Sequence, residues 1–301
     1  MLRALRPGWI VLSAALIFGA AEGAFARCEG VVPGQRPQNT AREDVGQTMD
    51  EIVERGFIEI AVYEDYRPYS WEEARTPKGV DVEVGKIIAE SLGVEARFRF
   101  VGAGESLDAD LLNYVWKGAV VGGHVSNVML RVPYDSDYAC RVEQVVFTGQ
   151  YAGEAVAIAY DVVSYPDGGP KPAYFRYDTV GVENDSIADF YLTGLIGAAA
   201  AANIHHYPST EAAMAGLAAH EVMAVMGPQA VLEASQGDGI AVHRPPMPNF
   251  ALSQWTVGAA VHQSHRDLGY AVDDAIAGAI DDGRIPAIYA SYGLSYLPPE
   301  R

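Results

Sequence analysis

The feature that most constrains the fold of this 301-residue sequence is a repeated alternation of short apolar strands with longer helices. Residues 58–63 alternate in polarity like a strand, and residues 82–92 have the apolar spacing of a helix that stops at Gly93. This order predicts an α/β protein with largely parallel sheets. Further strands are expected at 96–101, 120–128, 145–151, 155–160, 180–182, 222–226 and within 250–261, and helices at 48–55, 107–117, 186–202, 210–219, 229–235, 268–282 and 285–292.

The charge balance argues against two classes of partner. Lys and Arg total 21 against 39 Asp and Glu, a formal net charge of -18. Such a surface repels phosphate backbones and anionic lipid, so we expect no nucleic-acid binding. No stretch after the first residues is apolar for long enough to cross a bilayer, so we also expect no stable membrane insertion.

The first 26 residues have the pattern of a cleaved export signal. Arg3 and Arg6 precede a short apolar run at 9–18, and Ala24-Phe25-Ala26 supplies the small-residue cleavage site. We expect cleavage after Ala26, followed by a poorly ordered lead-in at 27–47. An uncleaved anchor is the alternative. Export to an oxidising compartment would allow Cys28 and Cys140 to pair, but their spacing does not decide it.

Motifs for catalysis or for cofactors are missing from the sequence. It contains no phosphate-binding GxxxxGK[ST], no dinucleotide-binding GxGxxG after a strand and no GxSxG nucleophile turn. His205 and His206 are adjacent and point apart, and His262 and His265 lack a third strong ligand. The carboxylates are scattered, without a recognisable acid–base pair. We therefore expect no metal, no cofactor and no enzymatic activity.

The best candidates for ligand contact lie where strands end, because open α/β sheets bind ligands at those edges. The loop after the first strand offers Tyr63, Asp65, Tyr69 and Trp71, whose aromatic rings are suited to clamping a small ligand. Ordinary packing of that loop against its own domain is the alternative.

A second group of candidates follows the strand expected at 120–128. His124, Ser126 and Asn127 would offer hydrogen bonds to a ligand carboxylate or carbonyl. Arg131 comes directly afterwards and would bind a carboxylate through two hydrogen bonds, unless it is an ordinary surface arginine. Ser186 opens a helix, where it either caps the helix or helps the free N–H groups bind an anion.

Several segments together resemble the extracellular solute-binding proteins of family 3, the amino-acid type. These are IEIAVYEDY, RPYSW and KGVDVEVGKIIAESLG near the start, VVFTGQY in the middle and IPAIYASYGL near the end. The resemblance covers roughly residues 48–297 and implies a periplasmic protein of two α/β lobes joined by two crossings. Lobe 1 would take residues 48–150 plus 258–301, and lobe 2 residues 151–257.

A narrower likeness is carried by LDADLLNYVWKGAVVGGHVSNVMLRVPYD and HEVMAVMGPQA. These resemble solute-binding-like proteins associated with PQQ-dependent methanol and alcohol dehydrogenases. By the resemblance, Arg131 or Arg141 fills the carboxylate-binding position, with about ten residues inserted between the two alignments. Gly227 falls where amino-acid binders have an aspartate, so an ordinary α-amino acid is a poor fit.

Three functions follow from these resemblances. The first is a non-catalytic periplasmic solute-binding-type protein whose partner is a PQQ-dependent dehydrogenase. The second is a receptor that delivers a small polar solute to an ABC permease. The third is a periplasmic dehydratase-like enzyme on the same fold.

Overall fold

The computed structural model describes residues 28, 30–32, 48–121 and 123–300. The expected export signal at 1–26 and most of the expected lead-in at 27–47 lie outside the described residues. In the part that is described, no helix is long and apolar enough to cross a membrane.

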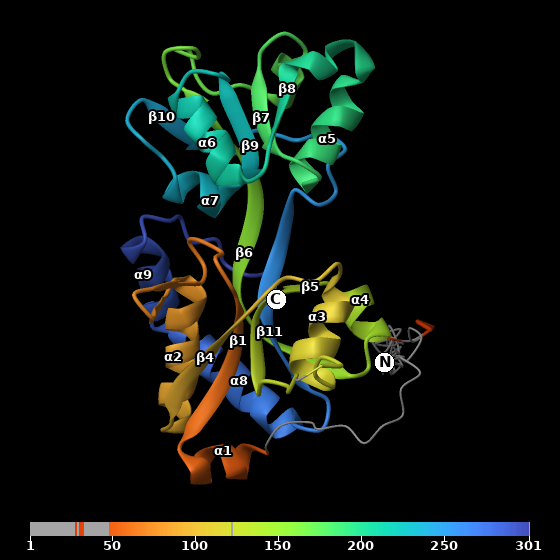
Figure 1. Ribbon diagram of the computed structural model, residues 1–301, viewed down its shortest axis with the longest axis vertical. Coiled ribbons are helices and arrows are strands. Elements are labelled where there is room, and N and C mark those ends of the chain that lie inside the picture. Colours follow the sequence, from red (N-terminus) through yellow and green to blue (C-terminus); the bar gives the residue numbers. More distant parts are fainter. Residues whose placement is uncertain (1–27, 29, 33–47, 122, 301) are drawn as a thin grey trace, which may run out of the picture.

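The molecule consists of two α/β lobes, one above the other in Figure 1, which confirms the predicted fold class. Nine of the described strands form one continuous sheet in the order β4-β1-β5-β11-β6-β9-β7-β8, with β10 paired to β6 beside this path. The short strands β2 and β3 pair only with each other. Helices cover both faces of the sheet in each lobe, as expected for strands that alternate with helices.

Lobe 1 is the lower lobe in Figure 1, and its centre is the parallel trio β4-β1-β5. One face of the trio packs against α2, α8 and α9, and the opposite face packs against α3. The elements are α1 (Met49–Arg55), β1 (Phe57–Tyr63), β2 (Trp71–Glu73), β3 (Thr76–Lys78), α2 (Val80–Leu92), β4 (Glu95–Val101), α3 (Leu107–Leu111) with a π-helical turn (Leu112–Trp116), β5 (Val128–Tyr134), α4 (Ser136–Arg141), α8 (Arg266–Asp281) and α9 (Arg284–Ser291).

Lobe 2 is built around a second parallel trio, β9-β7-β8. Helix α5 covers one face, and α6 and α7 cover the other. Its elements are a 3-10 turn (Pro172–Arg176), β7 (Val180–Glu183), α5 (Ile187–Ile196), a second 3-10 turn (Ala198–Asn203), β8 (Ile204–Tyr207), α6 (Thr210–Ala218), β9 (Ala224–Pro228), α7 (Gln229–Ala234) and β10 (Ile240–His243).

Two long antiparallel strands connect the lobes: β6 (Val145–Asp161) and β11 (Gln254–His262). The lower part of β11 pairs with β5, and the upper part of β6 pairs with β9 and β10. The C-terminal segment runs beside these strands. Gly153 donates a backbone hydrogen bond to the carbonyl of Leu297 (2.8 Å), and Ser295 donates one to the carboxylate of Glu233 in α7 (2.7 Å).

The strand expected at 120–128 is wrong, because β5 occupies Val128–Tyr134 instead. Val120 and Val121 are 97% and 90% exposed, so their apolar character does not mark a buried strand. The chain turns tightly here. A Cβ on Gly118, whose φ is +87°, would lie 2.8 Å from the carbonyl oxygen of Gly123, which only glycine accommodates.

Other boundaries also differ from expectation. The strands expected at 145–151 and 155–160 are one strand, and the helix expected at 186–202 ends at Ile196, after which Gly197 has a φ of +72°. Short elements β8, β10 and α4 were not predicted, because four to six residues carry too little periodicity to be recognised.

Candidate functional site

The carboxyl ends of the two parallel trios face each other across the junction of the lobes. Helix α7 follows β9 directly, and its Ala230 and Val231 pack into the core of lobe 1. In lobe 1, the loop after β1 leads to the first turn of α2. Since open α/β sheets bind ligands at such edges, this junction is the candidate site.

Arg131 is brought to the junction by a bulge in β5. Its neighbours Leu130 and Val132 pair with Ala259 and Gly258, so Arg131 is the extra residue without a partner on β11. Its φ is +60°, which a residue with a side chain rarely adopts. A bulge turns the side chain out of the regular alternation, and here it sends the guanidinium into the interior, where Arg131 is only 5% exposed.

Two buried carboxylates hold this guanidinium. Asp81, in the first turn of α2, accepts hydrogen bonds from Nε (2.6 Å) and Nη2 (3.0 Å) of Arg131. Glu154, in the connecting strand β6, accepts one from Nη1 (3.0 Å). Every guanidinium nitrogen thus donates to an internal carboxylate. The ion pair ties α2 and β5 of lobe 1 to the strand that leads into lobe 2.

Two tyrosines complete this buried cluster. The hydroxyl of Tyr69 donates to Glu154 (2.8 Å), and its ring lies against the guanidinium, 3.3 Å from the Cζ atom of Arg131 to the ring centroid. The hydroxyl of Tyr151 donates to Asp81 (2.8 Å). Two carboxylates and one guanidinium leave the cluster one negative charge in excess when all three are ionised. Burial raises the pKa of Glu154 above its ordinary value, although the nearby Arg131 and Tyr69 favour its charged form.

Tyr66 covers the cluster on the side of lobe 2. Its ring centroid lies 4.9 Å from that of Tyr69, and its side chain is 39% exposed. Desolvation raises the pKa of Tyr66 to about 12; the carboxylates of Glu154 and Asp81 and that of Glu183 from lobe 2 add to the rise. Tyr66 is thus the aromatic group that this loop presents to lobe 2.

On lobe 2, the site edge is formed by residues at or after the carboxyl ends of β7, β8 and β9. Glu183 accepts hydrogen bonds from the hydroxyl (2.8 Å) and backbone N–H (3.2 Å) of Thr210. Ser186 caps α5 through a hydrogen bond from the backbone of Asp189 (3.2 Å), one of the two roles expected for it. Gly227 lies in β9, where a Cβ would meet the side chain of Thr210 at 2.9 Å. No side chain larger than hydrogen fits there without movement.

The first strand's loop places its other candidates in different surroundings. The hydroxyl of Tyr63 donates to Asp110 (2.8 Å). Burial, together with this hydrogen bond, raises the pKa of Tyr63. Asp65 is exposed, with a φ of +49°. Trp71 is buried, with Arg67 stacked on its ring (4.3 Å to the centroid). Tyr69 and Arg131 are therefore the two candidates that the structure brings into direct contact.

His124, Ser126 and Asn127 lie at the opposite end of lobe 1. They precede β5, so they reach the start of the sheet, where His124 (2.9 Å) and Ser126 (2.8 Å) contact the carboxylate of Glu59. Asn127 accepts hydrogen bonds from Arg55 (2.6 Å) and from the backbone of Glu59 (3.0 Å). The eight-residue displacement of the strand is the reason that these three do not join Arg131.

Asp81, Glu154 and Tyr151 belong to the site but are not among the residues predicted from the sequence. A usable signal existed for Glu154, the one charge in the otherwise apolar or small run AGEAVAIAY, because a lone charge in a buried strand needs a partner. Asp81 lies within the segment KGVDVEVGKIIAESLG, where the resemblance assigns it no role. Arg141, the alternative to Arg131, lies exposed on α4 near the ring of Tyr138 (5.9 Å).

Cys28 and Cys140 form a disulfide, which settles the pairing that their spacing left open.

No protein-family model matches this sequence, and no curated protein is significantly similar to it. Solved structures do share its fold. An ancestral cationic amino-acid solute-binding protein has a TM-score of 0.65 at 15% identity, covering 81% of this chain and 99% of its own. The second substrate-binding domain of GlnP from Lactococcus lactis has a TM-score of 0.58 at 17% identity, covering 79% of this chain and 95% of its own.

An amino-acid ABC transporter substrate-binding protein from Streptococcus pneumoniae, bound to L-arginine, has a TM-score of 0.57 at 14% identity, covering 83% of this chain and all of its own. Most of these neighbours are non-catalytic binding proteins. A second structure of the ancestral protein identifies it as a precursor of cyclohexadienyl dehydratase, so some relatives with this fold are enzymes. None of the three neighbours described above is a dehydrogenase-associated protein, and that narrower resemblance is not confirmed. At these identities the comparisons show architecture, and the chain has the two-lobed fold of the periplasmic binding proteins.

Proposed function

We propose that this chain is an exported, non-catalytic solute-binding protein that holds a small polar solute between its lobes and presents it to an ABC permease. The observation that carries this proposal is the junction itself. Two parallel trios face each other by their carboxyl ends and are joined by two long strands, which is the arrangement for hinge closure on a ligand. The amino-acid-binding neighbours support it. We place the lobe boundaries at 150/151 and 257/258.

We further propose that the solute is not held by Arg131. A ligand carboxylate would have to displace Asp81 or Glu154, leaving a buried carboxylate without its cation, which costs about 3–5 kcal/mol. Tyr66 and Glu183 remain as contact groups on the two lobes. An aromatic ring and a carboxylate favour a neutral or cationic solute over an organic acid.

All three guanidinium nitrogens of Arg131 already donate to internal carboxylates, and this observation also favours a second role. A junction that binds no free carboxylate suits a protein whose partner is another protein. The resemblance to the proteins associated with PQQ-dependent dehydrogenases supplies the candidate. In this role the chain would assist a periplasmic alcohol dehydrogenase, and its lobes would serve for docking.

A thermal-shift screen of the mature chain tests these roles against amines, neutral amino acids, organic acids, alcohols and PQQ. A ligand at 100 times its dissociation constant adds about 2.7 kcal/mol to the free energy of unfolding, which moves the melting temperature by several degrees. A shift with an amine or neutral solute that Tyr66→Ala abolishes and Tyr174→Ala, at another exposed tyrosine, retains supports the receptor. A shift with organic acids alone that Tyr66→Ala abolishes contradicts the assignment of Arg131. Silence across the panel contradicts the receptor and turns the search to a co-purifying dehydrogenase.

A further inference from the structure

A pocket of about 300 Å³ lies in lobe 2, beside the two strands that connect the lobes. Its floor is Ala155 and Val156 of β6 and Gln254 of β11, where the two strands pair. The segment after β10, which contains Arg244 and Met247, forms its other wall. The pocket is separate from the candidate site, because it shares none of the groups around Arg131.

The wall of the pocket is held in place before any ligand arrives. Pro245 and Pro246 stiffen the segment after Arg244. Further along, Phe250 stacks on Tyr191 of α5, with ring centroids 4.3 Å apart and planes within 8°. The backbone N–H of Val156 donates to the carbonyl of Ser253 (2.9 Å), which fixes the other end of the segment to β6. In a preformed pocket, few side chains lose freedom when a ligand binds, so the entropic cost of binding is small.

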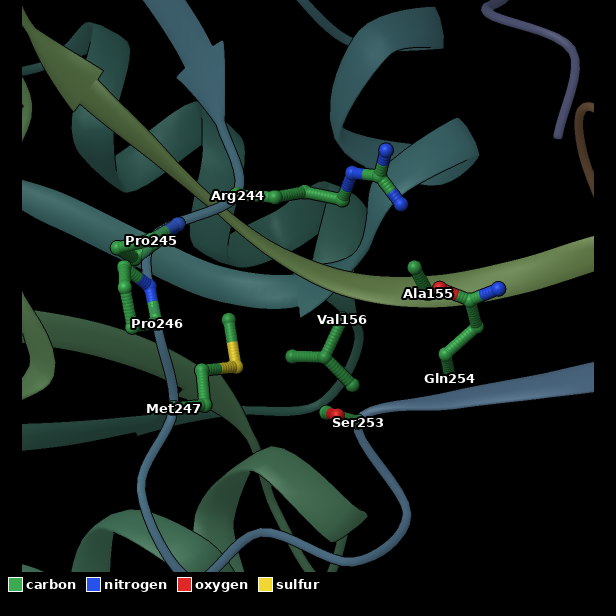
Figure 2. Close-up of a pocket in the computed structure, with 8 residues that line it drawn as sticks. All are labelled: Ala155, Val156, Arg244, Pro245, Pro246, Met247, Ser253 and Gln254. Carbon is green, nitrogen blue, oxygen red and sulfur yellow. The ribbon is translucent and has the colours of Figure 1, made fainter.

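The residues that line the pocket carry positive charge and no negative charge. Arg244 is the single charged residue among those that line the pocket, and no carboxylate lines it, although the sequence has 39 Asp and Glu. Arg244 is exposed, and no described residue forms an ion pair with it. Figure 2 shows its guanidinium on the same side of the pocket as the amide of Gln254, while Met247 and Val156 point toward each other below. A cationic and amide end therefore lies opposite an apolar end.

We propose that this pocket binds a small organic molecule with one carboxylate and a short apolar tail. The carboxylate is held by Arg244 with help from Gln254 and Ser253, since a guanidinium fits a carboxylate through two parallel hydrogen bonds. The tail contacts Met247 and Val156. Because the ligand touches both connecting strands where they enter lobe 2, its binding is coupled to the relative position of the lobes.

The experiment follows amide chemical shifts of the full mature chain by two-dimensional nitrogen–proton NMR while butyrate is added. We expect saturable shifts at the amides of Val156, Ser253 and Gln254. Butyramide, which has the same shape without the charge, should bind at least about tenfold more weakly, because charge-assisted hydrogen bonds are lost.

Two variants and one control separate the pocket from general charge effects. Arg244→Gln removes the cation at an exposed position, and Ser253→Leu fills the pocket while leaving Arg244 in place. Both should lose at least about tenfold in butyrate affinity. Arg176→Gln removes an exposed arginine elsewhere on lobe 2 and should bind butyrate like the parent chain.

Three outcomes would each overturn the proposal. They are butyrate binding that survives Arg244→Gln, the absence of saturable shifts, and shifts confined to Tyr66 and Glu183. The last of these would locate the anion in the candidate site instead.

Discussion

Arg131 shows how one residue with unusual backbone geometry organises a buried site. Its bulge and positive φ turn a strand residue inward, where Asp81 and Glu154 neutralise it and Tyr69 covers it. Buried ion pairs of this kind are costly to break from one side, because the remaining charge keeps its desolvation penalty without compensation. The partners of Arg131 are nevertheless unequal.

Asp81→Asn should destabilise the fold much more than Glu154→Gln. Asp81 accepts hydrogen bonds from two guanidinium nitrogens and from the hydroxyl of Tyr151. Glu154 still balances the charge of Arg131 in Asp81→Asn, so the expected loss of about 2–3 kcal/mol comes from weakening these charge-assisted hydrogen bonds. Glu154→Gln keeps an amide oxygen for Arg131 and should cost about 1 kcal/mol. Denaturant unfolding at neutral pH measures both. Equal losses would mean that the two carboxylates carry the same share of the charge.

Glu154 should also give the stability a specific pH dependence. Because burial raises its folded pKa above the ordinary value, folding favours the protonated form. This contribution is fully present below the unfolded pKa and is lost as the pH rises through the folded pKa. The parent chain should therefore gain stability relative to Glu154→Gln as the pH falls from 7 toward 4.5. A difference that shrinks over that range would contradict the raised pKa.

At the scale of elements, the sequence predicted helices and strands where periodicity is strong and failed where glycines and long-range pairs decide. Helix α2 lies at Val80–Leu92, close to the prediction, because its apolar spacing and Gly93 are local signals. The prediction of a strand at 120–128 was wrong because the chain turns at Gly118 and Gly123 and leaves the sheet there. Arg131 pairs with Asp81, 50 residues away, and with Glu154, 23 residues away, and no local sequence pattern encodes such pairs. Arg131 could be identified as a candidate from its residue type, whereas its internal partners could not be identified.

A pair of glycine substitutions tests the packing of β6 on α8. Gly149 has a φ of +53°, and a Cβ there would lie 2.6 Å from Cδ1 of Ile276 in α8, so Gly149→Ala should destabilise the fold by about 2 kcal/mol. Gly278, also in α8, has nothing within 4 Å of its Cβ position, so Gly278→Ala should stabilise by up to about 1 kcal/mol. Thermal unfolding compares them, and the same sign for both would contradict this packing.

At the scale of the whole molecule, the disulfide adds a constraint outside the sheet. Cys28 is linked to Cys140 of α4, 112 residues away along the chain. Closing so long a loop stabilises the folded state by up to about 4–5 kcal/mol, because the unfolded chain loses freedom. The double variant Cys28→Ser with Cys140→Ser should unfold at lower denaturant than the parent, and a reductant should move the parent, but not the variant, to the same midpoint. An unchanged midpoint for the variant would contradict a stabilising bond.

The C-terminal segment makes the connection between the lobes more than a pair of strands. It bonds to Gly153 in the connecting strand through Leu297, and Ser295 bonds to Glu233 of α7 in lobe 2. The hydroxyl of Tyr296 also donates to the carbonyl of Tyr151 (2.9 Å). A motion that carries α7 away from the connecting strands must therefore lengthen or break the bond between Ser295 and Glu233, while the bonds to Tyr151 and Gly153 hold the segment to β6.

Glu233→Ala should consequently free the upper end of this segment without unfolding either lobe. We expect faster hydrogen exchange at the amide of Ser295 and little change at Gly153, whose partner Leu297 is untouched, because the lost bond is local. Glu233→Gln keeps an acceptor oxygen and should fall between the parent and the alanine variant. Small-angle scattering on the same samples should show a larger radius of gyration for Glu233→Ala if this bond limits opening. Unaltered exchange at Ser295 together with unaltered scattering would show that the two connecting strands alone set the distance between the lobes.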